Sequence, residues 1–152
     1  MLIELIFKGS FINLDFNLLR NLIKEADEIY FVCPEISSIR TFDEAYKVFQ
    51  LNTYVDFVIK TNHLHIDQKN VERVFINIGR NNDDIDFLFF FDLKDINEGD
   101  KKRNLMLVRQ WMAQIQKKYN FQYFICQMDN ANNDEYYFDS NGVGRLYKEL
   151  DN

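Results

Sequence analysis

The stretch IDFLFFF, residues 85–91, decides how this sequence is expected to fold. It contains the most apolar run of the chain, Phe87–Phe91, with Asp86 and Asp92 on either side. A short apolar run that is rich in aromatic residues is typical of a buried β-strand. The chain has no run near the roughly 18 apolar residues that a membrane span requires. We therefore predict a strong buried strand here and no membrane-spanning segment.

Four other segments have the pattern of strands. Residues 2–7, 29–33 and 121–128 are apolar runs, and Pro34 stops the second of them. Residues 54–60 alternate instead, which places every second apolar side chain on one face. The dipeptide Asn141-Gly142 favours a tight hairpin turn between strands at 136–140 and 143–147.

Four segments have helical patterns. Asn13 or Asp15 can cap a first helix, and Thr41 with Glu44 has the spacing of a capping box that begins a second. Residues 67–78 repeat apolar side chains at helical spacing, although Val-Phe-Ile-Asn-Ile could equally form a strand. The strongest apolar seam, Leu105–Tyr119, predicts a long helix that ends at Asn120.

This order, β-α-β-α-β-α-β-α-β followed by a β-hairpin, predicts an α/β fold. We expect a mixed, mainly parallel sheet with helices on both faces, formed by one domain over residues 1–152. If residues 67–78 are not helical, the expectation moves to an α+β fold.

The charge of the chain limits its partners. The formal net charge is −6 and the pI is near 4.9, which argues against nucleic-acid binding because phosphate contacts need clustered Lys and Arg. A basic protein partner is compatible with this charge. Cys33 and Cys126 each lie in an apolar run, so we expect buried, reduced thiols and a cytoplasmic protein.

Motifs for catalysis and cofactor binding are absent from the sequence. Gly142-Val143-Gly144 lies in the predicted hairpin, not between a strand and a helix, so no phosphate-binding loop is expected there. His63, His65 and Asp67 have a spacing that could hold a metal, but a loop of half-exposed histidines is the simpler interpretation. We predict no metal and no cofactor.

Aspartates at two strand ends give the best hypothesis for an enzyme. Asp92 follows the strand at 85–91, and Asp129 follows the one at 121–128. Two such carboxylates could hold Mg²⁺ in a hydrolase. The chain shows no Lys, Ser or Thr pattern that would complete a phosphoryl-transfer site, so aspartates that cap turns explain them equally well.

Acidic residues on both sides of the 85–91 strand are the candidates for partner binding. They could steer a basic partner, or they could be solvated surface, and Asp100 also suits the start of the long helix. Trp111 lies one position off the apolar seam and is either part of the core or an exposed anchor. The candidate residues are Asp83, Asp84, Asp86, Asp95, Glu98, Asp100 and Trp111.

In general character the chain resembles the immunity proteins that neutralise bacterial polymorphic or contact-dependent toxins. The resemblance lies in its size, its acidic charge, its 17 Asn and the aromatic hairpin at Tyr136–Phe138. It implies a non-enzymatic inhibitor that binds one toxin domain tightly in the cytoplasm of the producing cell. The alternatives are the Mg²⁺-dependent hydrolase and an accessory subunit of an assembly; the oligomeric state is not predicted.

Overall fold

The computed structural model of the chain describes residues 1–152 apart from 97–99, 130, 133 and 152. Its strands are β1 (Leu2–Ser10), β2 (Glu28–Cys33), β3 (Tyr54–Thr61), β4 (Leu64–Ile66), β5 (Lys69–Val71), β6 (Val74–Asn81), β7 (Asp84–Asp92), β8 (Tyr123–Met128), β9 (Tyr136–Asp139) and β10 (Gly142–Val143). Its helices are α1 (Asn17–Lys24), α2 (Phe42–Leu51), α3 (Lys101–Tyr119) and α4 (Arg145–Lys148), with 3-10 turns at Leu93–Asp95 and Glu149–Asp151.

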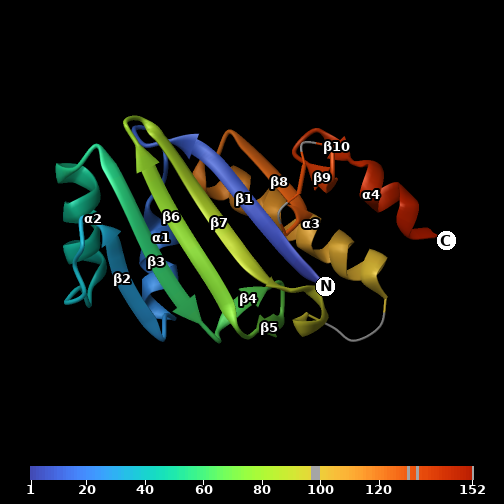
Figure 1. Cartoon of the computed structure of the whole chain (residues 1–152), viewed down its shortest axis with the longest axis horizontal. Coiled ribbons are helices and arrows are strands. Elements are labelled where there is room, and N and C mark those ends of the chain that lie inside the picture. The colour runs from blue at the N-terminus through green and yellow to red at the C-terminus, as the bar shows by residue number, and fades with distance from the viewer. Residues whose placement is uncertain (97–99, 130, 133, 152) are drawn as a thin grey trace.

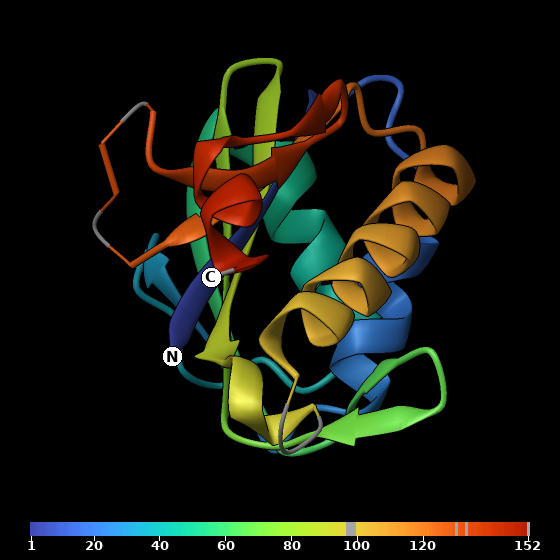
Figure 2. The ribbon, with the colours of Figure 1, turned by 90° about the vertical axis from the view of Figure 1, so that its right-hand side faces the viewer.

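Eight of these strands form one sheet in the order β10-β9-β8-β1-β7-β6-β3-β2 (Figure 1). Every neighbouring pair in this sheet is antiparallel. Helices α1, α2 and α3 lie on the same side of the sheet, as the blue, teal and gold ribbons of Figure 2 show. The predicted α/β fold, with a mainly parallel sheet covered on both faces, is therefore wrong.

One error lies in the segment at residues 67–78. Asp67 has a φ of 57° and turns the chain between the short strands β4 and β5, so it does not begin a helix. Residues 74–81 then form β6, which pairs with β3 on one side and β7 on the other. The short turn between β6 and β7 makes these two neighbours antiparallel. The connection through α2 does not give a parallel pair either, because β2 and β3 are also antiparallel.

Several local predictions are confirmed. The Thr41 side chain accepts from the Glu44 backbone N–H at 3.2 Å, and the Glu44 carboxylate accepts from the Thr41 N–H at 3.1 Å, which is the capping box at the start of α2. Asn120 ends α3 in the left-handed conformation, with a φ of 68°. The predicted C-terminal hairpin is only partly correct, because its second arm is two residues long and α4 follows.

The core lies between the sheet and the helices. Trp111 is 8% exposed and meets the rings of Phe7 and Phe89 edge-on, with centroid distances of 5.9 and 5.7 Å. Its indole therefore packs inside the molecule. Cys126 is buried as predicted, and burial raises the pKa of its thiol. The same prediction is wrong for Cys33, which is exposed at the end of the edge strand β2.

The position of Trp111 gives a test of the core. We expect Trp111→Ala to lower the free energy of unfolding by about 3–5 kcal/mol, the usual cost of removing a buried Trp side chain. Trp111→Phe keeps most of the aromatic packing and should cost less. Urea denaturation followed by circular dichroism measures both. A loss below about 1 kcal/mol for the alanine variant would contradict the packing described here.

Candidate partner-binding surface

The sheet has a second face, opposite α1, α2 and α3, which we call the uncovered face (Figure 1). Because side chains alternate along a strand, each long strand contributes to both faces. On β7, Phe87 and Phe89 are fully buried on the helical side, whereas the alternate residues Leu88 and Phe90 lie on the uncovered face. Helices α1, α2 and α3 leave this face of the sheet open.

A groove of about 210 Å³ opens on the uncovered face near the β6–β7 hairpin. Gly79 on β6 lies directly between Asp86 on β7 and Asp56 on β3, and it has no side chain to fill the space between the two carboxylates. Asp84 and Tyr54 also line the groove. We call the surface of Tyr54, Asp56, Gly79, Asp84 and Asp86 the acidic groove.

The carboxylates of the acidic groove differ in their surroundings. Asp56 accepts a hydrogen bond from the side-chain amide of Asn77 on the neighbouring strand. Desolvation in the groove raises the pKa of Asp86, Lys8 opposes this shift, and the nearby Asp84 adds to it. A carboxylate with a raised pKa is held in its charged form at neutral pH at a cost in folding free energy. A cationic partner group would remove that cost.

Arg80 also borders the groove, but its guanidinium makes its described contacts with other parts of the chain. Its guanidinium donates to the backbone carbonyls of Phe49, Asn52 and Asn82. It also lies 3.7 Å from the ring centroid of Phe11. Arg80 thus connects the hairpin to the end of α2 and to the loop after β1, and it does not neutralise the carboxylates by a described contact.

Asp83, one of the predicted partner-binding residues, holds the tip of the hairpin in place. Its carboxylate accepts from the Ser10 hydroxyl at 2.6 Å and from the Ile12 backbone N–H at 3.1 Å. Its carbonyl accepts from the Phe11 N–H at 2.6 Å. These bonds position the β6–β7 turn and, through it, Asp84.

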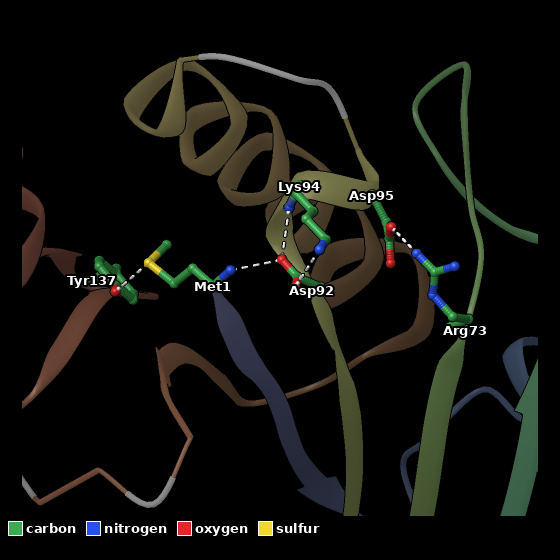
Figure 3. Close-up of polar contacts among 6 residues, drawn as sticks. All are labelled: Met1, Arg73, Asp92, Lys94, Asp95 and Tyr137. Atoms are coloured by element: carbon green, nitrogen blue, oxygen red, sulfur yellow. Dashed lines mark hydrogen bonds and ion pairs between the residues drawn. The ribbon is translucent and has the colours of Figure 1, made fainter.

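The acidic residues after β7 are separated from the groove. Asp95 pairs with Arg73 at 2.6 Å, at the opposite end of β7 (Figure 3). Asp100 caps the N-terminus of α3 and accepts from the Lys102 backbone N–H at 3.0 Å. Glu98 lies outside the described residues. The structure therefore gathers only Asp84 and Asp86 of the predicted acidic set on the uncovered face.

The candidate magnesium residues have other contacts. Asp92 accepts from the N-terminal ammonium of Met1 at 2.7 Å, and its second oxygen lies 3.7 Å from Lys94 Nζ (Figure 3). The hydrogen bond from the ammonium lowers the pKa of Asp92. Asp129 is exposed beyond the end of β8. Ion pairs thus account for the position of Asp92 without a metal.

The histidines are exposed on the helical side. His63 Nε2 lies 3.5 Å from the Asp27 carboxylate, and His65 is in the short strand β4. Among the described residues, no three His, Cys, Asp or Glu side chains are placed to hold a metal ion together.

A larger hollow, of about 400 Å³, lies at the other end of β3 and β6. Its charged residues are balanced, since Asp27 and Glu28 face Lys60 and Arg73. Such a site would not select a partner by the sign of its charge. The acidic groove, with Asp56, Asp84 and Asp86 against Arg80, carries an excess of negative charge that the larger hollow lacks.

Sequence reasoning missed Asp56 and Gly79. Asp56 lies inside the predicted strand at 54–60, and Gly79 directly follows the segment 67–78 for which the sequence predicts a helix. The alternation around Asp56 does predict that it faces away from the core. No sequence signal shows that it lies one strand away from Gly79, because that depends on the pairing of β3 with β6.

Comparisons with known proteins place this chain in the class of immunity proteins. The chain belongs to the PABL017 Cdi1I immunity protein family, whose model matches residues 1–142. It is also similar in fold to a chain from a crystal structure of the toxic C-terminal tip of CdiA from Pseudomonas aeruginosa in complex with immune protein. That match has 19% identity and a TM-score of 0.71, and it covers 95% of this chain and 97% of the other.

These findings confirm the resemblance to toxin immunity proteins that the sequence indicated. The comparison with curated proteins gave no match. Within the part of the chain that the structure describes, none of the helices has the length and apolar character needed to cross a membrane.

The raised pKa of Asp86 predicts how the groove affects stability. Between about pH 3.8, the pKa of an unperturbed Asp, and the higher folded-state pKa, the folded protein binds more protons than the unfolded one. Stability therefore falls as the pH rises through this window. Asp86→Asn removes the ionisation, so we expect the variant to be more stable than wild type at pH 7, by less than about 1 kcal/mol because solvent screens the site.

Urea denaturation at pH 3 and pH 7 measures this difference. The free energy of unfolding of Asp86→Asn should exceed that of wild type at pH 7. The difference should be smaller at pH 3, where residue 86 is neutral in both proteins. A variant that is less stable than wild type at pH 7 would contradict the raised pKa.

Proposed function

We propose that this immunity protein neutralises a toxin domain by placing the acidic groove against a basic surface of the toxin. Binding would cover groups that the toxin needs, without any chemical reaction. We propose that the toxin domain and the immunity protein meet in the cytoplasm of the producing cell, the location that the sequence predicts.

Membership of the immunity protein family supports the kind of partner. The similar fold that was crystallised with the toxic tip of CdiA supports a direct protein complex. The negative charge of the chain supports a partner of opposite sign, because complementary fields raise the association rate and disfavour wrong partners.

The acidic groove is the observation that carries the proposal. Asp56, Asp84 and Asp86 converge around Gly79, where a lysine or arginine side chain has room to enter. A guanidinium could contact carboxylates on two strands at once, which fixes orientation as well as charge. Asp83 would act indirectly, by holding the hairpin that presents Asp84.

The charge proposal is tested by binding kinetics with the toxin partner, identified by affinity pull-down and then purified. In the double variant Asp84→Asn/Asp86→Asn, we expect the association rate constant at low salt to fall about tenfold. Its dependence on salt should also become flatter, because fewer charges attract the toxin. Stopped-flow or surface plasmon resonance across a salt series measures both.

Asp67→Asn is the matched control. Asp67 is an exposed acid in the β4–β5 turn, and asparagine also adopts its left-handed conformation. The control removes one negative charge far from the groove, so it should leave both the rate and its salt dependence close to wild type. Equal effects of the control and of each single groove variant would mean that only net charge matters.

Gly79 gives a test that leaves every charge in place. A Cβ there would have Val55 O, at 3.9 Å, as its nearest contact outside the adjoining residues, so the fold has room for a side chain. We expect Gly79→Val to keep or raise the melting temperature, because valine suits a strand better than glycine. The same variant should weaken toxin binding at least tenfold by filling the groove, with Gly79→Ala between it and wild type.

Unchanged affinity in a folded Gly79→Val protein would show that no toxin group enters the groove. Calorimetric titration measures the affinity, and thermal denaturation confirms that each variant is folded.

A further inference from the structure

The uncovered face carries a continuous row of apolar side chains beside the acidic groove. Ile125 on β8 pairs with Ile6 on β1, which pairs with Leu88 on β7. Phe90 follows two residues after Leu88 on the same face and pairs with Phe75 on β6. The five side chains therefore touch or adjoin one another across four strands, and we call them the apolar belt.

The belt is separate from the core that the helices cover. All five of its side chains are half-buried, and the core cluster of the described residues contains none of them. Val58 on β3 is 3% exposed although it too lies outside that cluster. Side chains of the uncovered face thus cover each other. An antiparallel sheet with one solvated face normally alternates apolar and polar residues, so an apolar row on the open face is unusual.

The charges around the belt indicate what can cover it. Asp86 and Lys8 adjoin it on the hairpin side, with Asp84 beyond them, and Glu4 lies beside Phe90 on the other side. Three carboxylates and one lysine give this rim a net negative charge. A second copy of this acidic chain would bring two such rims together, which is unfavourable. A surface whose apolar centre has a basic border fits both the belt and its rim.

We propose that the apolar belt is the centre of the toxin interface, and that it binds an apolar patch of the toxin bordered by Lys or Arg. This inference rests on the proposed function and adds to it, because it assigns affinity to the belt and steering to the acidic groove. Interfaces commonly have this arrangement, with a desolvated apolar centre and a charged rim.

The two surfaces have different kinetic signatures. Rim charges act mainly on the association rate and its salt dependence, whereas apolar contacts at the centre act on dissociation. Burial of the belt should also give the complex a negative heat-capacity change of binding.

The test is the double variant Leu88→Thr/Phe90→Thr with the purified toxin domain. Threonine suits a strand, and both positions face away from the core, so the fold should persist. We expect the dissociation rate to rise at least tenfold, the heat-capacity change of binding to become less negative, and the salt dependence of association to stay at the wild-type value. Ile125→Thr, on another strand, gives an independent variant that should shift the same two quantities less.

Val32→Thr is the matched control, because Val32 is 50% exposed on the edge strand β2, outside the belt. It should leave dissociation unchanged. A folded double variant that dissociates from the toxin at the wild-type rate would overturn the proposal. So would a wild-type protein that is dimeric by sedimentation and becomes monomeric in the double variant, since the belt would then join two copies.

The experiment also separates this inference from the charge proposal. If the belt variants raise the dissociation rate while the groove variants leave the association rate unchanged, the belt proposal is supported and the charge proposal is contradicted. If the groove variants lower the association rate and the belt variants leave the dissociation rate unchanged, only the belt proposal is contradicted. If hydrogen exchange of the wild-type complex shows protection only on α1 and α3, the toxin binds the helical side and both assignments fail.

Discussion

The pairing of β1 with β7 is the constraint on which the rest of this structure depends. The two strands pair over their full length, from Leu2 opposite Asp92 to Ser10 opposite Asp84. This register places the buried phenylalanines of both strands on one side, against α3, and it aligns Ile6 with Leu88 on the other. A shift of one strand by one residue would turn its outer side chains toward the helices and bury either Asp86 or Lys8 in the core. The core and the binding surface are therefore set by the same pairing.

The sequence predicted the elements better than their arrangement. The strand at 85–91, the capping box at Thr41 and the end of α3 at Asn120 follow from local chemistry, because each depends on a few neighbouring residues. The segment 67–78 was ambiguous, since its apolar residues suit both a helix and an alternating strand. The left-handed turn at Asp67 decided in favour of strands. The direction of the strands did not depend on this segment alone, because β2 and β3 pair antiparallel although α2 connects them.

The candidate site was predictable only in part, for a related reason. Asp84 and Asp86 could be selected because they lie next to the most apolar run of the chain, Phe87–Phe91. Asp56 and Gly79 could not, because their proximity to Asp86 depends on register between strands that are distant in sequence. The contacts of Asp83 with Ser10 and of Asp95 with Arg73 could not be predicted either, because only the tertiary fold brings these residues together. A charge pattern alone does not distinguish a carboxylate that binds a partner from one that holds a turn.

The alternation along β7 has a consequence for how such a protein can change over generations. Phe87 and Phe89 lie in the core, while Leu88 and Phe90, one position along the chain from them, lie outside the core cluster. Recognition could drift toward a new toxin by substitutions at every second residue, while the interleaved residues keep the scaffold intact. One short stretch of chain can in this way be selected for folding and for toxin recognition independently.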